Sequence, residues 1–265
     1  MKPILFIAHS EAADGGRLAV YLRRRGYPIQ IVRPIHGDAL PERLDSLEGC
    51  VILGGPMSAN DDHLDGIKLE LTWMERALGQ DLPLLGVCLG AQLMARILGA
   101  QVWVHPQEHV EIGYHEVFPT RAGERLFPRG LRAFQWHREG FDFPVGVTVL
   151  AEGTEFPSQA FSVDDIHYAF QFHPELTPRR LAAWLSNAAH RLTQPGAHSP
   201  ARQWRDQALY DAQVDTWIPS LIDAWLSQGQ SQGQSQGQSR ARLGSQPSFQ
   251  PTSIETPTAM PLGLS

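Results

Sequence analysis

The chain has 265 residues, of which 42% are hydrophobic and 19% are charged, and its formal net charge is −6. This length and composition suit one soluble globular domain with extensions, long enough to bury a substantial core. The acidic balance argues against nucleic acid as a partner, and no apolar run approaches the roughly 20 residues of a membrane span. Only two cysteines occur, so we expect no disulfide and a reducing, cytoplasmic setting.

Short apolar runs and longer amphipathic runs alternate through the first half of the chain. We expect strands at residues 4–8, 29–33, 50–53 and 84–87, and helices at 15–25, 65–78 and 91–98. This alternation predicts an α/β fold with a doubly wound, mostly parallel sheet and helices on both faces. The apolar run at the N-terminus is too short for a secretion signal and is predicted to be the first strand.

Residues 102–172 contain more strand-like than helix-like stretches. The clearest predicted strands are residues 147–150, 159–163 and 167–172. Because few helical stretches separate them, we expect antiparallel strands added at one edge of the sheet. A helix at residues 178–192 is then predicted to close a first domain that spans residues 1–195.

Residues 199–226 are predicted to form one or two added helices, with Pro219 as a kink or break. The apolar face of this segment consists of Leu209, Trp217, Leu221, Ile222 and Trp225. This face either packs onto the domain or forms a surface for a partner, such as a second copy in a homodimer. Residues 227–265 begin with Ser-Gln-Gly-Gln repeats, and this low complexity predicts a disordered tail.

Cys88 lies in the most informative stretch, Leu-Gly-Val-Cys-Leu-Gly-Ala-Gln (85–92). A predicted strand precedes it and a predicted helix follows, which is typical of a nucleophile elbow. Gly86 and Gly90 would let the strand and the helix pack closely around a strained turn. The positive end of the helix dipole favours the thiolate, which is the nucleophilic form. The alternative is a small buried hydrophobic residue, as we expect for Cys50.

A candidate base follows in Tyr-Ala-Phe-Gln-Phe-His-Pro-Glu (168–175). His173 comes at the end of a predicted strand that Pro174 stops, and functional residues concentrate at strand ends in α/β sheets. Glu175 is placed to orient the imidazole and stabilise its charge, as the third member of a triad does. The alternative is a strand-end histidine with a solvated glutamate beside it.

Gly54 and Gly55 follow the predicted strand at residues 50–53, in Gly-Gly-Pro-Met-Ser (54–58). Glycines at the carboxyl end of a strand expose backbone N–H groups that can face a ligand. A tetrahedral intermediate needs such donors for its oxyanion, and the N–H groups of Gly55 and Leu89 are the natural pair. The alternative is an ordinary turn between a strand and a helix.

These three motifs, in this order, resemble the class I glutamine amidotransferase family, and the resemblance extends over about residues 1–192. The amidotransferase domain of GMP synthetase is the nearest named resemblance. Membership implies a flavodoxin-like fold, no cofactor, and a triad of Cys88, His173 and Glu175. It also implies an oxyanion hole at Gly55 and Leu89.

The resemblance further implies a glutamine pocket lined by Gln92 and Gly54. The segment Gln-Trp-His (135–137) is similar, more loosely, to the family loop whose backbone holds the amino-acid end of the substrate. His137 is then either a substrate contact or merely a strand-end histidine. The implied reaction is hydrolysis of a γ-carboxamide through a γ-glutamyl thioester, with release of ammonia and glutamate.

No phosphate-binding glycine loop of an ammonia-using synthase appears in the sequence. The ammonia is therefore expected to go to a separate synthase chain or to no acceptor. In the second case the protein is a γ-glutamyl-amine or γ-glutamyl-peptide hydrolase with the same triad. A third interpretation is a non-catalytic binding module that kept the fold, and the intact triad residues argue against it. The expected ligand is a small molecule in the first two cases.

Histidine and glutamate residues lie close together in the sequence at His105, Glu108, His109, Glu111, His115 and Glu116. Their spacing matches no zinc signature. Pro106 interrupts any helix that would align two ligands one turn apart. We therefore expect no metal site in this stretch.

Overall fold

A single eight-stranded sheet forms the centre of the computed structural model, which describes residues 1–80 and 82–232. The strands lie in the order β2-β1-β3-β4-β12-β11-β10-β7. They span, in that order, Ile29–Val32, Ile4–Ile7, Gly49–Ile52, Leu84–Val87, His167–Phe170, Ser158–Val163, Thr148–Glu152 and Phe118–Pro119. Strands β2 to β12 are parallel, and β11, β10 and β7 are antiparallel additions. The predicted α/β class and the antiparallel edge are thus confirmed.

The central strands are buried along their whole length rather than on alternate residues. Every residue of β1, β3, β4 and β12 is buried. This is the pattern of a parallel strand that is covered on both faces. The order of the strands also brings the carboxyl ends of β1, β3, β4 and β12 to one edge, where α/β proteins bind ligands.

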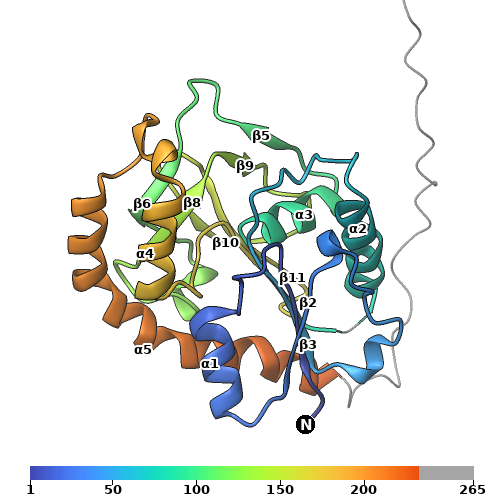
Figure 1. The fold of residues 1–265 in the computed structure, drawn as a ribbon. Helices are drawn as coiled ribbons and strands as arrows, with labels where there is room; N and C mark the ends of the chain where they lie inside the picture. Colours follow the sequence, from blue (N-terminus) through green and yellow to red (C-terminus); the bar gives the residue numbers. More distant parts are fainter. Residues whose placement is uncertain (81, 233–265) are drawn as a thin grey trace, which may run out of the picture. The chain divides into compact units, whose positions relative to one another are not determined.

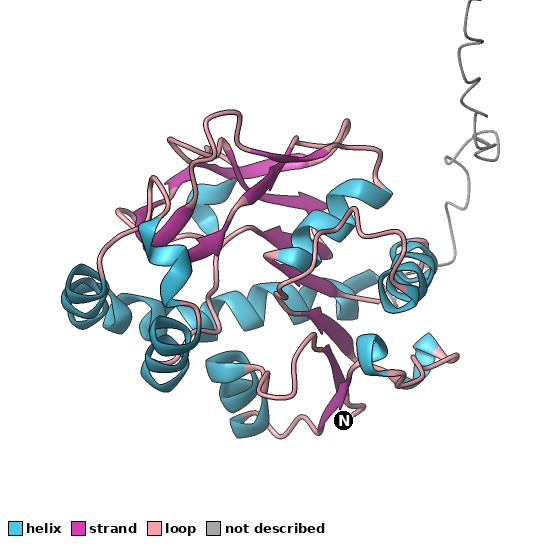
Figure 2. Cartoon of the chain, turned by 45° about the horizontal axis from the view of Figure 1, so that its top comes forward, coloured by secondary structure: helices cyan, strands magenta, loops and turns pink. Residues whose placement is uncertain are grey.

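Helices cover the sheet on both sides, as Figures 1 and 2 show. Helices α1 (Gly16–Arg24) and α5 (Pro200–Gln232) share one hydrophobic core with the sheet, and α2 (Asp65–Leu78) and α3 (Leu89–Ile97) share the other. Within the described ranges, no helix combines the length and the hydropathy needed to cross a membrane.

Two small antiparallel sheets lie beside the main one, and the sequence does not separate them from the edge strands. Strand β5 (Val102–Val104) pairs with β9 (Glu139–Phe141), and β6 (Glu111–Glu116) pairs with β8 (Arg132–His137). Helix α4 (Pro178–Asn187) packs on β6 and β8 in a third apolar cluster. Short 3₁₀ turns occur at Pro34–His36, Leu44–Ser46, Gly123–Arg125 and Ala189–Thr193.

Helix α5 is one continuous helix that contains Pro219, and it extends to Gln232 rather than ending at residue 226. Its predicted apolar face packs onto the sheet at Trp217, Leu221, Ile222 and Trp225. Leu209 was expected on the same face, but its side chain is 62% exposed, so that expectation is wrong. The predicted tail beyond residue 232 lies outside the described residues.

Two other predicted elements end at least two residues earlier than expected. Strand β12 stops at Phe170, two positions before the predicted end, because the chain turns at Gln171 toward Pro174. The helix expected at 178–192 is α-helical only to Asn187 and continues as a 3₁₀ turn from Ala189.

A tight turn joins β11 to β12 at the edge opposite the strands' carboxyl ends. Val163 pairs with His167 across it. Asp164 and Asp165 have φ angles of 51° and 55°, in the left-handed region. Two consecutive positive φ angles twist the chain in the sense that a tight antiparallel hairpin requires.

Candidate active site

Cys88 occupies the turn between β4 and α3, as the elbow pattern predicts. Its backbone has φ 52° and ψ −105°, and it is the N-cap residue of α3. A non-glycine residue with positive φ is strained, and such strain concentrates at functional sites. The Cys88 N–H donates to the Phe170 carbonyl oxygen at 2.8 Å, which ties the turn to β12. The thiol therefore lies at a helix N-terminus beside the strand that leads to His173.

Glycine is required on both sides of this turn. A Cβ atom on Gly90 would collide with the carbonyl oxygen of Ile52, and one on Gly86 would lie 2.7 Å from the backbone carbonyl carbon of Gly90. Both contacts are closer than packed atoms allow, so the strand and the helix approach to a distance that only glycine permits. This agrees with the reason given for these glycines from the sequence.

His173 is held between a backbone anchor and a carboxylate. Its N–H donates to the Phe134 carbonyl oxygen at 2.8 Å, and its Nδ1 lies 2.8 Å from Glu175 Oε1. The ring is packed edge-on against Trp184, with the centroids 5.0 Å apart. Nε2 is buried and makes no hydrogen bond within the described residues, so it is the nitrogen left for chemistry.

The charges around His173 favour its protonated form. Burial alone lowers the pKa of His173, but the Glu175 carboxylate and the Cys88 thiolate outweigh burial and raise the pKa to about 10. Gly54 fits between the same groups, because a Cβ on it would lie 2.8 Å from His173 Cε1 and 3.3 Å from Cys88 Cβ. The fold thus brings together Cys88, His173, Glu175 and Gly54.

The peptide between Gly54 and Gly55 is held by a buried histidine that also contacts a buried glutamate. His9, just after β1, has its Nδ1 3.2 Å from the Gly54 carbonyl oxygen and its Nε2 2.9 Å from Glu70 Oε2. Both side chains are completely buried. The C=O of Gly54 and the N–H of Gly55 belong to one planar trans peptide, so they point in opposite directions. The bond from His9 to the carbonyl therefore also sets the direction of the Gly55 N–H.

The N–H groups of Gly55 and Leu89 are both unused. Within the described residues neither donates a hydrogen bond. Leu89 is the first residue of α3, whose N–H groups have no acceptor inside the helix. Two free donors on either side of the thiol are what an oxyanion hole requires.

A small pocket opens at Cys88. Its walls include Gly55, Cys88, Gln92, His137, Arg138 and Arg191. The Gln92 amide is tied to the wall, because its Nε2 donates to the Glu139 carbonyl oxygen at 2.8 Å. The predicted substrate residues Gln92 and His137 thus reach the same pocket as the candidate nucleophile.

His137 ends β8, and both nitrogens of its ring are engaged. Nδ1 lies 3.1 Å from the Glu139 carbonyl oxygen, and Nε2 lies 3.1 Å from Glu111 Oε2. Burial raises the pKa of Glu111, but the bond and charge of His137 dominate and lower it overall. The ring is therefore held in a buried network, and the part of His137 left to meet a ligand is its backbone.

A sequence model described as glutamine amidotransferase class-I matches residues 16–192, which is well over half of the chain. The chain belongs to the class I glutamine amidotransferase family. The predicted family and fold are therefore confirmed.

Two relatives illustrate the range of similarity within this family. A putative glutamine amidotransferase-like protein, YfeJ, of Salmonella typhimurium is 29% identical over 196 residues, covering 71% of this chain and 81% of the relative. A glutamine-hydrolyzing GMP synthase of Aeropyrum pernix is 32% identical over 195 residues, covering 69% of this chain but only 36% of the relative. The chain thus spans about a third of that synthase.

Solved structures agree on the fold. A glutamine amidotransferase from Methylobacillus flagellatus has a TM-score of 0.80 and 30% identity, covering 86% of this chain and 95% of the other. A glutamine amidotransferase from Thermotoga maritima has a TM-score of 0.77 and 26% identity, covering 85% and 98%.

Four residues of this class I amidotransferase site were not found from the sequence: His9, Glu70, Arg138 and Arg191. His9 had a usable signal, because it follows a predicted strand and so lies at the edge where Cys88 lies. Arg191 had none, since it comes from the 3₁₀ turn after α4. Burial lowers the pKa of Arg191, the charge of Arg138 lowers it further, and the Cys88 thiolate opposes both.

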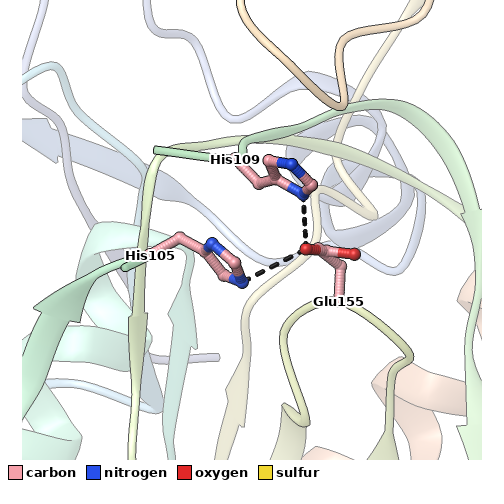
Figure 3. A group of neighbouring side chains, drawn as sticks. All are labelled: His105, His109 and Glu155. Atoms are coloured by element: carbon pink, nitrogen blue, oxygen red, sulfur yellow. Dashed lines mark hydrogen bonds and ion pairs between the residues drawn. The ribbon is translucent and has the colours of Figure 1, made fainter. Parts of the chain in front are cut away.

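The histidine and glutamate side chains of residues 105–116 lie in three different places. Glu111 joins the His137 network, and His115 stacks on His198 with ring centroids 4.5 Å apart. His105 and His109 instead meet Glu155, which lies far away in the sequence (Figure 3). Among the described residues, this last group is the one whose donor atoms lie close enough to hold a metal ion.

Proposed function

We propose that this class I amidotransferase hydrolyses the γ-carboxamide of glutamine through a triad of Cys88, His173 and Glu175. The observation that carries the proposal is the position of His173, which is bound to Glu175 on Nδ1 and keeps a buried, unbonded Nε2 near the thiol of the elbow. This is the arrangement in which a histidine relays a proton between a nucleophile and a leaving group.

The reaction proceeds in two steps. The Cys88 sulfur attacks the carboxamide carbon, and His173 gives its proton to the departing ammonia, which leaves a γ-glutamyl thioester. Water, which loses a proton to His173, then attacks the thioester and releases glutamate and the free thiol. The N–H groups of Gly55 and Leu89 stabilise the oxyanion in both steps.

The position of Arg191 favours a substrate that carries a negative charge. Arg191 lines the pocket that contains Cys88, and within the described residues no carboxylate pairs with its guanidinium. Arg138 adds a second positive charge in the same pocket, although it also lies 3.6 Å from Glu139. Guanidinium groups bind carboxylates with high geometric specificity, so the α-carboxylate of glutamine is a suitable ligand.

The use of the ammonia is a separate part of the proposal. The GMP synthases among the relatives are much longer than the shared region, so their acceptor chemistry does not transfer with the domain. We propose that a separate synthase chain accepts the ammonia. A relative from Pyrococcus abyssi, which is named as one subunit of a glutamine-hydrolyzing GMP synthase, is an example of the domain on a chain of its own.

The test measures ammonia and glutamate release by the purified chain from glutamine, γ-glutamyl amines and γ-glutamyl peptides. We expect turnover of glutamine, and Cys88→Ala should reduce it by about 10⁴-fold or more because the nucleophile is lost. Glu175→Gln should lose less, because Glu175 only orients and stabilises His173. Folding of each variant is checked by its thermal unfolding temperature.

Other outcomes would revise the proposal in defined ways. Turnover of a γ-glutamyl amine or peptide well above that of glutamine would reassign the substrate to that class. Near wild-type activity in Cys88→Ala would rule out the nucleophile. Silence toward every compound, together with a Cys88 thiol that reacts with a glutamine-mimicking alkylator, would show that the acceptor chain must first activate the site.

A further inference from the structure

Three side chains that commonly bind metals converge on the surface, outside the catalytic pocket (Figure 3). His105 follows β5, His109 precedes β6, and Glu155 lies between β10 and β11. Their donor atoms all lie within 4.8 Å of one another. Glu155 Oε1 is 3.1 Å from His105 Nε2 and 2.5 Å from His109 Nδ1. The connection between β5 and β6 and the connection between β10 and β11 thus meet at the Glu155 carboxylate.

The two imidazole rings are held side by side by their surroundings. They lie nearly parallel, with centroids 5.0 Å apart and an interplanar angle of 11°. Phe156 packs 5.5 Å from His105 and stacks on Trp103 at the same distance, which supports one ring from behind. Glu108 has a φ of 55°, and its N–H donates to the His105 carbonyl oxygen, which closes the turn between the two histidines.

We propose that His105, His109 and Glu155 bind one divalent ion of the zinc type. Two imidazole nitrogens and one carboxylate oxygen suit Zn²⁺, whereas Mg²⁺ and Ca²⁺ prefer oxygen ligands in greater number. Three protein ligands leave a fourth position for water. The side chains are 13%, 38% and 37% exposed, so an ion can enter from solvent.

Binding requires both rings to change tautomer. Each ring nitrogen that faces Glu155 must lose its proton to the other nitrogen of the ring before it can coordinate an ion. For His105, that other nitrogen accepts the Gln107 N–H at 3.2 Å, so this hydrogen bond is given up on binding. We therefore expect a local rearrangement of residues 105–108.

The ion would clamp two connections together and would take no part in the chemistry at Cys88. None of the three ligands lines the pocket at Cys88. Phe156, next to Glu155, packs edge-on against His137 with the centroids 4.7 Å apart. The clamp therefore lies behind the wall of the pocket, and its main expected effect is on thermal stability.

The test is calorimetric titration of the chelator-treated chain with ZnCl₂ at pH 7.5. Cys88→Ala is the background, because a thiolate beside a histidine also binds zinc. We expect one ion per chain and a higher unfolding temperature with zinc. Glu155→Gln and His109→Ala in this background should weaken binding by about 100-fold or more, since loss of an outer-shell partner alone costs roughly 10–100-fold. His63→Ala, at an exposed histidine elsewhere, should bind as the background does.

Three results would overturn the assignment. The first is a lack of saturable zinc binding by the Cys88→Ala chain. The second is unchanged affinity in both ligand variants, and the third is equal affinity for MgCl₂, which imidazole ligands do not explain. Because the background lacks the thiol, none of these outcomes depends on whether the chain hydrolyses glutamine.

Discussion

At the scale of single residues, three buried histidines near the carboxyl ends of the parallel strands each contact a glutamate. His9 meets Glu70, His137 meets Glu111, and His173 meets Glu175. Burial of an unpaired charge is costly, whereas a paired and hydrogen-bonded charge can fix the direction of nearby groups. Each histidine is also connected to the wall of the Cys88 pocket. His137 is part of that wall, His9 contacts Gly54 beside it, and the His173 N–H donates to β8, which ends in the wall.

His9→Gln should reduce kcat for glutamine with little change in KM. The variant loses the imidazole bond that directs the Gly54 carbonyl, so the Gly55 N–H is aimed less well at the oxyanion. The expected loss is about 10–100-fold, below the roughly 10²–10³-fold that removal of an oxyanion donor costs. Steady-state kinetics measure this effect.

A second readout separates this role from a structural one. Alkylation of Cys88 by iodoacetamide passes through no oxyanion, so its rate should stay within about twofold of wild type in a folded His9→Gln chain. An equal fall in kcat and in the alkylation rate would mean that His9 instead supports the elbow itself.

Arg191→Met should raise the KM for glutamine about tenfold or more while kcat changes little. Met keeps much of the aliphatic length but cannot pair with the substrate carboxylate, and a charge-assisted hydrogen bond contributes roughly 1.5–3 kcal/mol. The matched control is Arg179→Met, an exposed arginine on α4 that does not line the pocket. Equal effects of the two changes would remove Arg191 from substrate binding.

The sequence predicts the site residues that lie in continuous motifs, and it misses those that reach the site through the packing of distant elements. Cys88 and its glycines lie in a continuous motif, because the elbow is built from neighbours in the chain. His9 and Glu70 contact each other across 61 positions, and Arg191 reaches the pocket from a turn after α4. Such contacts depend on how the elements pack. The position of His9 after a strand indicates the right edge of the sheet but not its contact with Glu70, and no local pattern indicates Arg191.

At the scale of elements, the segment that enters α5 is fastened to β6. The N–H of His198 donates to the Ile112 carbonyl oxygen at 2.8 Å, and the His198 ring stacks on His115. Gly113 makes room for this contact, since a Cβ there would collide with the His198 ring. Gln203 caps the segment by donating to the His198 carbonyl oxygen at 2.7 Å.

The stability of this junction should depend on pH. Burial lowers the pKa of His198 to about 4, and the charges of His115 and Arg202 act in the same direction. The unfolded chain takes up a proton near pH 6.5. Between pH 4 and pH 6.5 the unfolded chain therefore binds more protons than the folded chain. The contribution of neutral His198 to stability is fully present above about pH 6.5 and is lost as the pH falls toward 4.

Urea unfolding at pH 7 and pH 5 tests this linkage. For the wild type, the urea concentration at the unfolding midpoint should be lower at pH 5 than at pH 7. This decrease should be smaller in His198→Gln, because that side chain does not titrate. His36→Gln, at an exposed histidine, is the control and should fall as the wild type does. An identical fall in His198→Gln would show that other groups cause the acid sensitivity.

The elements of the first half follow their sequence patterns more closely than those of the second. Helix α2 begins and ends at the expected residues, because its amphipathic pattern is undisturbed. The strands from β5 to β9 follow less directly from the sequence, since a strand pattern does not identify the partner of each strand. Whether β6 pairs with β8 or with the main sheet depends on the core under α4.

At the scale of the whole molecule, the two ends of the described chain support each other. Helix α5 lies across the same face of the sheet as α1, and Arg17 of α1 pairs with Asp211 and Asp215 of α5 at 2.6 Å each. The Nε of Arg17 also donates to the Leu176 carbonyl oxygen, just beyond Glu175. Helix α5 is therefore part of the support of the turn that contains Glu175.

Trp225→Ala should destabilise the whole fold by about 3–5 kcal/mol, which is typical for loss of a large buried aromatic side chain. Trp225 is fully buried, and its ring lies 3.0 Å from the position of a Cβ on Gly49 of β3. Leu209→Ala on the exposed side of the same helix should cost no more than about 0.5 kcal/mol. Urea unfolding of both variants measures the difference, and equal values would mean that α5 does not contribute to the core as described.

The tight turn at Asp164 and Asp165 has a practical use. Strand β12 is parallel to β4, so its carboxyl end, which leads to His173, lies beside the carboxyl end of β4, which leads to Cys88. The turn joins β11 to the opposite end of β12. A short peptide tag inserted between the two aspartates would project away from Cys88. Strands β11 and β12 pair along four residues each, so their pairing does not depend on the turn alone. The turn is therefore the natural place for an affinity tag or a fluorophore that reports on the protein without blocking substrate.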